Sequence, residues 1–489
     1  MAPLRPTPLL VALLVAACGD STVSRGAVRN VVLLTLDTTR ADYLSCYGPH
    51  GLPTPNLDAL AAEGTRFDLA LSTASVTPVS HAAILTGRYN HSHGLRVLFA
   101  EGGYRLPAEV ETLATVLDGH GFHTRAVHSA FPVSRFFGLE RGFDEFQDLV
   151  TGFEAGQDEF HWDVAKFQRR SDATTDLVTR DLGDEPFFLW VHYWDPHDLA
   201  ELPPGLELDP SKRGESSDLR QPFYAEEVQY VDAQIGRLVA ALKERGLYDS
   251  TMIVVVADHG QGLMDHGWPG HRLLYQEHIR VPLIVRVPLV APRAAVEELA
   301  RTVDIYPTVL DYLGIAPPRA ISGRSLRPLL EGRPDEPRLA FADQLNGLDW
   351  NAGQIRQRPL DDFLYAVVER EWKYVYRPMR PRKSELFHLA SDPGELTDVS
   401  EQHPEVVRRL LGELAREAPW VSEPFAPLGG AGADVQATLS GLGYTGTDPV
   451  EAEWEWSCPE HRSERWPTRG PCPTCGSPPL LVGRRAEGR

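Results

Sequence analysis

Three runs of hydrophobic residues predict the frame of the fold. Val31 to Leu36, Phe187 to Tyr193 and Met252 to Ala257 are nearly continuous apolar stretches, rich in β-branched and aromatic residues. Because hydrophobic and polar positions do not alternate in them, we expect strands buried on both faces, as in a parallel sheet. Each run leads into a polar segment. These segments would lie at the carboxyl ends of the strands, where open α/β sheets bind ligands.

Helical periodicity separates these strands. Phe223 to Arg245 repeats apolar residues at intervals of three and four, which predicts a long helix that covers the sheet. A shorter amphipathic helix is expected from Glu109 to Leu117, followed by a strand from Phe122 to Val127. From Phe363 to Tyr376, aromatic and β-branched residues alternate around a turn, which favours an antiparallel hairpin. The pattern predicts an α/β protein whose mostly parallel central sheet is covered by helices, with a small antiparallel sheet after it.

Composition and charge narrow the class of ligand. The chain has 489 residues, of which 42% are hydrophobic and 24% charged, as in an ordinary globular protein. Its net charge of −20 argues against nucleic acid or an anionic membrane face as a partner. An anionic substrate would gain nothing from this overall field. Positive charge must therefore come from the site itself, which indicates a bound cation.

The N-terminal segment predicts export. Arg5 precedes an apolar stretch from Leu9 to Ala17, which is too short to span a bilayer and is typical of a secretory signal. The sequence VAAC that ends at Cys18 resembles a bacterial lipobox, which would make Cys18 the lipidated first residue of the mature chain; a simple cleaved signal is the alternative. We expect a lipoprotein signal peptide over residues 1–18, a linker over 19–29, and an extracytoplasmic, membrane-anchored lipoprotein in the periplasm or at the cell surface.

A hydroxyl stands at the start of a predicted helix in the stretch Ser72 to Gly94, STASVTPVSHAAILTGRYNHSHG. Thr77 precedes Pro78, which suits a first helical turn, and Ser80 is expected to cap the free amides there. A nucleophile at this position would lie where amide donors and the helix dipole favour an anionic group. Thr77 is therefore the candidate nucleophile, and Ser80 is its main rival.

The run from Ser80 to Gly94 resembles the signature of the sulfatase family within the alkaline-phosphatase superfamily, C/S-x-P-S-R-x-x-L-L-T-G. When the two are aligned on Ala83 to Gly87, the family's nucleophile falls on Thr77 and its arginine on His81. Sulfatases convert Cys or Ser at the nucleophile position into formylglycine, and threonine is not a known substrate for that conversion. The branch that this chain resembles reads T-x-P-S-H, whereas the proline here has moved one place, to T-P-V-S-H.

The resemblance extends from Asn30 to Gly446 through several motifs in the same order. NVVLLTLDTTRADYLSCYG resembles the first metal-ligand segment, with Asp37 where many sulfatases have paired aspartates; an ordinary turn or N-cap aspartate is the alternative. RVPLI, VDIYPTVLDYLG and ELFHLASDPGELTDVS also have counterparts. The resemblance implies an alkaline-phosphatase-like fold, with a catalytic domain over residues 30–340 and a C-terminal subdomain over 341–446.

Asp258 and His259 directly follow the third buried run, Met252 to Ala257. Together with Asp37 they form a ligand set of hard oxygens and one imidazole, which suits one divalent cation: calcium, magnesium, manganese or zinc. Thr77 would contact the same ion. Sulfatases usually have Asp-Asn at this point, and Asp-His resembles the phosphatase, phosphodiesterase and phosphonate-hydrolase side of the superfamily.

The same resemblance implies roles for two other histidines. His197 falls on a substrate-contacting or leaving-group histidine, and His271 falls where relatives carry a substrate-contacting Lys or His. The Lys and His of the family's G-K-W-H segment, which contact the sulfate, are replaced by Ser129 and Phe131. His192 is expected to be a packed or hydrogen-bonded strand residue.

The expected chemistry is metal-dependent hydrolysis of an anionic ester, with in-line attack by Thr77 and protonation of the leaving group by His197 or His271. Formylglycine releases sulfate by breaking down as a hemiacetal, whereas a threonine ester needs water to attack its central atom. That step is routine for phosphothreonine and less favourable for a threonine sulfate, so we predict phosphorus esters (phosphate monoesters, diesters or phosphonates) ahead of sulfate esters. The alternatives are a sulfuric-ester hydrolase without formylglycine, a phosphoryl transferase, and a non-catalytic lipoprotein that binds an anionic glycan or lipid head group.

A separate Cys/His tail is expected over residues 447–489. It contains three cysteines and a histidine at a spacing that suits a tetrahedral zinc site and resembles a small heavy-metal-binding domain. A disulfide between the last two cysteines is the alternative. The four predicted ligands are Cys458, His461, Cys472 and Cys475.

Overall fold

The computed structural model describes residues 27–418, except for 49, 101, 150–170, 183–185, 198–219 and 350–356, together with three short strands near the C-terminus. The predicted signal peptide with Cys18, most of the linker over 19–29, and the four tail ligands lie outside the described residues.

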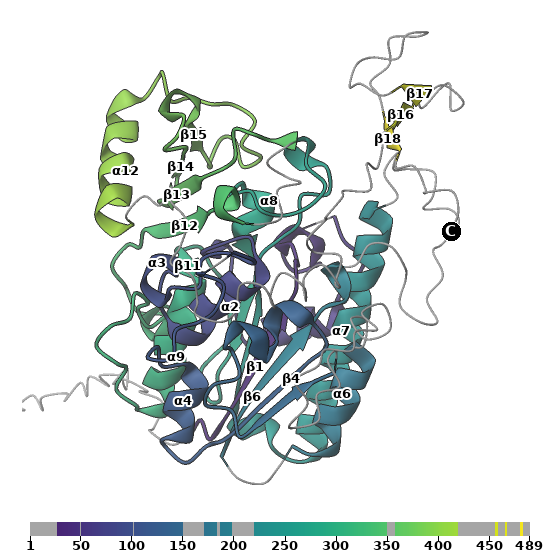
Figure 1. Ribbon diagram of the computed structural model, residues 1–489. Helices are drawn as coiled ribbons and strands as arrows, with labels where there is room; N and C mark the ends of the chain where they lie inside the picture. Colours follow the sequence, from purple (N-terminus) through teal and green to yellow (C-terminus); the bar gives the residue numbers. More distant parts are fainter. Residues whose placement is uncertain are drawn as a thin grey trace, which may run out of the picture.

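An eight-stranded, mostly parallel sheet forms the centre of the molecule (Figure 1). β1 lies in its interior and pairs in parallel with β6 on one side and β7 on the other. Only β9 runs antiparallel to its neighbours within this sheet, among the strands described. In sheet order the strands are β10 (Arg293–Val296), β2 (Thr65–Phe67), β9 (Leu283–Arg286), β7 (Thr251–Ala257), β1 (Asn30–Leu36), β6 (Phe187–Tyr193), β4 (His123–His128) and β5 (Glu145–Asp148).

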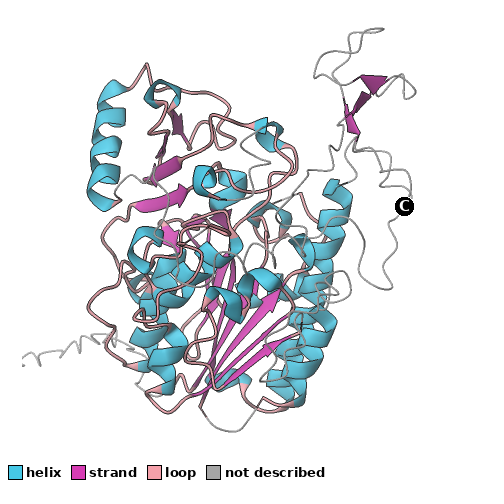
Figure 2. Ribbon diagram, in the orientation of Figure 1, coloured by secondary structure: helices cyan, strands magenta, loops and turns pink. Residues whose placement is uncertain are grey.

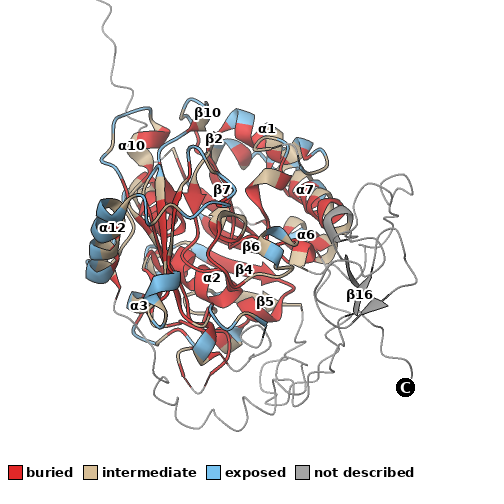
Figure 3. Cartoon of the chain, turned by 90° about the horizontal axis from the view of Figure 1, so that it is seen from above, coloured by how far each residue is buried: buried red, intermediate tan, exposed pale blue. Residues whose placement is uncertain are grey.

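The continuous hydrophobic runs form the three central strands, as predicted, because every residue of β1, β6 and β7 is buried. Helices cover both faces of the sheet: Figure 1 shows α6 and α7 on one side and α2, α4 and α9 on the other. Seen from above in Figure 3, the buried residues follow the sheet and the inner faces of these helices. The helices are α1 (Pro55–Glu63), α2 (Thr77–Thr86), α3 (Asn90–His93), α4 (Leu113–Asp118), α6 (Ser171–Arg180), α7 (Arg220–Glu244), α8 (Gln276–Ile279), α9 (Ile305–Leu313), α10 (Arg327–Leu330) and α12 (Pro404–Glu417).

The amphipathic helix predicted from Glu109 begins later, at Leu113. Thr112 is its N-cap, and the Thr112 side chain accepts a hydrogen bond from the amide of Thr115. Because a threonine cap fixes where a helix can start, the apolar periodicity before it does not extend the helix. The prediction of a helix was right here and its first boundary was wrong by four residues.

A smaller antiparallel sheet of four strands follows the central one in the chain (Figure 2). Its strands β13 and β14 form the predicted hairpin, and α12 packs against both. No helix in the described part of the chain is long and apolar enough to cross a membrane. The four strands are β12 (Ala340–Gln344), β13 (Leu364–Val368), β14 (Trp372–Tyr376) and β15 (Glu385–His388); β3 (Ala70–Leu71), β8 (Arg280–Val281) and β11 (Ala300–Arg301) form a third sheet, and β16 (Glu455–Ser457), β17 (Arg465–Trp466) and β18 (Leu480–Val482) a fourth.

Candidate active site

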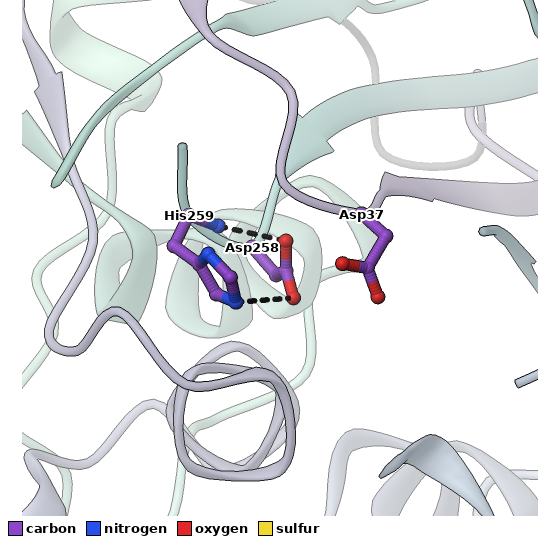
Figure 4. Close-up of side chains that lie close together, drawn as sticks. All are labelled: Asp37, Asp258 and His259. Carbon is purple, nitrogen blue, oxygen red and sulfur yellow. Dashed lines mark hydrogen bonds and ion pairs between the residues drawn. The ribbon is translucent and has the colours of Figure 1, made fainter. Parts of the chain in front are cut away.

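Asp37, Asp258 and His259 meet at the carboxyl ends of two adjacent parallel strands (Figure 4). Asp37 follows β1 directly and Asp258 follows β7, and the strand register pairs Leu36 with Ala257. One potential ligand atom from each of the three side chains lies within 4.8 Å of the others. All three residues are fully buried. The residues that the sequence suggested as metal ligands are therefore brought together by the register of the sheet.

The two carboxylates fit a divalent cation because the described part of the protein leaves their charge uncompensated. Both oxygens of Asp37 and Oδ2 of Asp258 are buried without a hydrogen-bond partner among the described residues. Burial raises the pKa of Asp37 well above its ordinary value, and the neighbouring Asp258 carboxylate raises it further. Burial likewise raises the pKa of Asp258, to about 8. Two buried carboxylates and one imidazole nitrogen, whose ligand atoms lie within 4.8 Å of one another, form a donor set for a hard metal ion. Asp37 also accepts no capping hydrogen bond from these residues, which leaves no support for an N-cap role.

Backbone amides hold the second oxygen of Asp258. Oδ1 accepts hydrogen bonds from the amide of Thr38 at 3.0 Å and from the amide of His259 at 2.7 Å. Thr38 has a φ of +47°, which is unusual for a β-branched residue and strained. The strained turn brings its N–H within reach of Asp258. Oδ1 is therefore fixed, and Oδ2 remains available for an ion.

His259 presents an unprotonated nitrogen to the site. Its Nδ1 lies 2.9 Å from the carbonyl oxygen of Gly260, and because a carbonyl can only accept, Nδ1 carries the proton. Nε2 is then an acceptor. It lies 3.5 Å from Oδ2 of Asp258 and 3.3 Å from the hydroxyl oxygen of Thr77. Gly260 is required here, since a Cβ on it would stand 2.1 Å from the carbonyl oxygen of Glu277.

Thr77 is the first residue of α2, and Pro78 occupies the first turn as predicted. The predicted cap is wrong. Val76 is the N-cap and supplies no side-chain hydrogen bond. The hydroxyl of Ser80 donates back to the carbonyl oxygens of Val76 and Thr77 because the helix begins at Thr77 and Ser80 already lies inside it. The first amides of α2 therefore lack a side-chain cap, and the Thr77 hydroxyl stands beside them.

His81 lies one turn further along α2, at the position of the family arginine. Its Nδ1 donates to the carbonyl oxygen of Thr77 at 2.8 Å and lies 3.6 Å from Oδ2 of Asp258. Burial lowers the pKa of His81 to about 3; the hydrogen bond to the Thr77 carbonyl oxygen offsets part of this effect, and the neighbouring His128 adds to it. Unlike an arginine, this imidazole is neutral at physiological pH. Its Nε2 is buried without a partner among the described residues.

His271 and His197 lie next to this group. The His271 ring is centred 4.8 Å from that of His259 and 5.5 Å from that of His197. Nδ1 of His271 donates to the carbonyl oxygen of Ser75 at 2.9 Å, which again leaves Nε2 as an acceptor. Burial lowers the pKa of His271 well below its ordinary value. His197 is half-buried and stacks on Trp194 at 4.0 Å.

His192 is the site residue that sequence reasoning missed. It was expected to be a packed or hydrogen-bonded strand residue, and its Nδ1 does lie 2.9 Å from Oγ1 of Thr35. Its Nε2, however, lies 3.2 Å from Oδ2 of Asp37, at ion-pair distance but outside hydrogen-bond alignment. The pairing of β1 with β6 sets His192 beside Thr35, two positions before Asp37. Because residues two apart on a strand face the same side, this register brings His192 to Asp37, and the sequence of either strand alone does not show it.

The comparisons with known proteins show the family of this chain. A family model described as "Sulfatase" matches residues 29–315, and one described as "N-sulphoglucosamine sulphohydrolase, C-terminal" matches residues 264–418. The chain is 24% identical to the N-acetylglucosamine-6-O-sulfatase of Bacteroides thetaiotaomicron, over 80% of this chain and 86% of the relative. It is 27% identical to an arylsulfatase of Clostridium perfringens, over 79% and 94%.

The solved structures include both sulfatases and phosphonate hydrolases. The phosphonate monoester hydrolase of Agrobacterium radiobacter superposes with a TM-score of 0.65 at 23% identity, covering 80% of this chain and 96% of that one. This likeness supports the predicted α/β fold. The sulfatase model alone covers more than half of the chain. The chain belongs to the sulfatase family, within the alkaline-phosphatase superfamily, and is an ester hydrolase.

Proposed function

We propose that this hydrolase cleaves phosphorus esters in a metal-dependent reaction with Thr77 as the nucleophile. The observation that carries the proposal is the position of the Thr77 hydroxyl, 3.3 Å from Nε2 of His259 and beside the buried ligand group of Asp37 and Asp258. A hydroxyl at this point cannot become formylglycine by the known sulfatase maturation. The family relationship therefore supports the fold and the hydrolysis of an ester. Thr77 supports a reaction that does not use formylglycine.

Asp37, Asp258 and His259 would hold one divalent cation, with the Thr77 oxygen in contact. When bound, such a cation lowers the pKa of a hydroxyl group and neutralises charge on an ester oxygen. Three features of the chain prepare the attack. Oδ1 of Asp258 is fixed by two amides, Nε2 of His259 is unprotonated, and Thr77 begins a helix whose first amides lack a side-chain cap. Those amides favour the negative charge that develops during the transfer.

The tautomer of His271 assigns it one of the two proton transfers and leaves the other to His197. His271 donates from Nδ1 to a carbonyl, so its Nε2 can accept a proton. This arrangement suits the second half of the reaction, in which water attacks the threonine ester and gives up a proton. His197 is then assigned to protonation of the leaving group in the first half. Atoms balance over the cycle: the leaving oxygen departs with the proton that Thr77 gives up, water adds its hydroxyl to the phosphorus as the bond from phosphorus to the Thr77 oxygen breaks, and the other proton of water returns to that oxygen.

The preference for phosphorus rests on the fate of the intermediate. A threonine ester has no second hydroxyl on its carbon, so it cannot break down as formylglycine does. Water must attack the central atom, which phosphorus tolerates better than the sulfur of a sulfate ester. Sulfuric-ester hydrolysis through the same threonine is the second candidate, and it is favoured by the names of the relatives in Bacteroides and Clostridium.

The test compares nitrophenyl phosphate, phosphodiester, phosphonate and sulfate as substrates of the chain without residues 1–18, each with calcium, magnesium, manganese or zinc. We expect metal-dependent turnover of a phosphorus ester that falls by about 10³-fold or more in Thr77→Ala and is partly retained in Thr77→Ser. Ser80→Ala is the matched control, since its hydroxyl bonds only within the helix turn. Sulfate turnover in its place would reject the phosphorus preference, and undiminished turnover by Thr77→Ala would reject the nucleophile.

We further propose that Cys18 carries the lipid anchor of an extracytoplasmic lipoprotein and that Cys458, His461, Cys472 and Cys475 bind zinc. The lipobox-like VAAC and the Cys/His spacing support these assignments. Membrane fractionation of Cys18→Ala tests the anchor. Zinc content of Cys472→Ser tests the tail, because retention of a full zinc equivalent would contradict the assignment.

A further inference from the structure

We infer that His192 is a positioning residue that orients the carboxylate of Asp37 for the cation, through a hydrogen-bond relay with Thr35 and Trp190. The inference rests on the proposed metal site and adds residues that no family motif supplied. All three members of the relay are fully buried in β1 and β6. None of them is a candidate ligand.

The relay begins at Trp190. Its indole Nε1–H donates to Oγ1 of Thr35 at 2.9 Å, and Oγ1 in turn lies 2.9 Å from Nδ1 of His192. An indole nitrogen can only donate, so the Thr35 oxygen is the acceptor in the first of these contacts. The Thr35 hydroxyl still has its own hydrogen to place. Among the described residues, Nδ1 of His192 is the acceptor bonded to it.

This arrangement decides the tautomer of His192. If Nδ1 accepts from Thr35, the proton of the neutral ring resides on Nε2. Nε2 is the atom that lies 3.2 Å from Oδ2 of Asp37. His192 therefore presents an N–H to the carboxylate, and an N–H cannot coordinate a metal. His81, His259 and His271 have the opposite tautomer, because each donates from Nδ1 to a backbone carbonyl.

The two carboxylates of the site differ in what holds them. Asp258 is fixed through Oδ1 by two backbone amides, but neither oxygen of Asp37 has a hydrogen-bond donor aligned with it among the described residues. His192 is the neighbouring donor. A small rotation of the Asp37 carboxyl group aligns Oδ2 with Nε2–H and leaves Oδ1 for the ion. Partners of this kind behind a metal ligand typically contribute 10- to 100-fold in metal affinity.

The test measures binding of Mn²⁺ alone to the full chain, followed by the electron paramagnetic resonance signal of the free ion. We expect Thr35→Val to weaken Mn²⁺ binding about 10-fold and His192→Phe by about 10- to 100-fold. His192→Gln, whose amide nitrogen can replace Nε2–H as a donor, should stay within a few fold of the wild type. The matched control is Thr251→Val, a buried threonine at the opposite end of the sheet whose hydroxyl donates to Leu247; it should leave Mn²⁺ affinity unchanged.

Two outcomes separate the relay from the metal site itself. If Asp258→Asn binds Mn²⁺ as tightly as the wild type does, the proposed cation site is wrong. If Asp258→Asn abolishes binding but Thr35→Val and His192→Phe bind normally, the site stands and the relay is rejected. Equal weakening by His192→Gln and His192→Phe would also reject it, because ring packing would then matter and the donor would not. Thr35→Val keeps the test valid if His192→Phe does not fold.

Discussion

Asp37 and Asp304 are both fully buried aspartates, yet their surroundings are opposite. Asp304 lies at the corner between β11 and α9, where Arg301 reaches its Oδ1 at 2.6 Å and Arg338 its Oδ2 at 3.3 Å. The amides of Arg301 and Arg324 also donate to it. Asp37 has no cationic side chain and no aligned hydrogen bond among the described residues. A buried carboxylate with this many partners stabilises structure, whereas one without them is a site for an external cation.

The largest effect should come from removing the second carboxylate beside Asp37, that of Asp258, whose Oδ2 has no hydrogen-bond partner among the described residues. We expect Asp258→Asn to lower metal-dependent turnover by about 10³-fold or more and to remove the rise in melting temperature caused by added metal. With chelator present and above pH 8, where Asp258 is ionised, the same substitution should raise the free energy of unfolding, because it removes a buried charge. Turnover assays and urea titrations measure the two effects. A destabilised chelator-treated variant would show that the two amide hydrogen bonds to Oδ1 outweigh the cost of burying the charge.

Asp304→Asn should do the reverse. It leaves Arg301 and Arg338 buried without their carboxylate, and breaking such a group costs about 3–5 kcal/mol in the free energy of unfolding. Turnover per folded molecule should persist, since Asp304 is not part of the ligand group. Urea denaturation with active-site titration measures both quantities. If Asp304→Asn lowered the free energy of unfolding by less than about 1 kcal/mol, the contrast between the two aspartates would be wrong.

The pH dependence of the metal-free protein should sharpen the comparison. Burial raises the pKa of Asp258 to about 8 from an unfolded value of 3.8, so the folded state binds more protons between these values and loses stability as the pH rises. The buried imidazole of His81, with a pKa of about 3, has the opposite effect, but only below the unfolded value of 6.5. Of these two groups, only Asp258 changes the free energy of unfolding between pH 6.5 and 8. Its effect over this range is up to about 2 kcal/mol. Urea unfolding with chelator should show this decline in the wild type and a smaller one in Asp258→Asn; equal slopes would contradict it.

The smallest effect is expected at the surface. Arg370 and Glu297 form an ion pair at 2.8 Å, with side chains 65% and 74% exposed. Solvent screens such pairs, so Glu297→Gln should change the free energy of unfolding by less than about 0.5 kcal/mol. The same urea titrations provide the measurement. A change as large as that at Asp304 would mean that proximity alone, rather than burial, decides the contribution of these carboxylates.

The sequence was most informative where structure depends on local pattern. The strands around Val31, Phe187 and Met252 were predicted closely because unbroken β-branched and aromatic runs have few other uses. Their polar ends then placed Asp37 and Asp258 at one edge of the sheet. The boundary of α4 and the role of Ser80 were wrong, because the N-cap decides which residue begins a helix and apolar periodicity does not report it.

His192 could not be recognised from its own segment. Its role depends on the register between β1 and β6, which sets it beside Thr35, and on the hydrogen bond that decides which ring nitrogen carries the proton. Both are relations between residues separated by 157 positions in the chain. Sequence motifs describe neighbours along the chain, so a partner behind the ligand remains invisible until the strands are paired.

The strained turn at Thr38 also bears on how the protein matures. Its amide donates to Asp258, 220 positions further along the chain, and the pairing of β1 with β7 brings the two residues together. A chain that ends before β7 lacks Asp258 and His259, so this ligand group cannot form in it. Binding of a cation to these three residues would therefore report that β1 and β7 have paired.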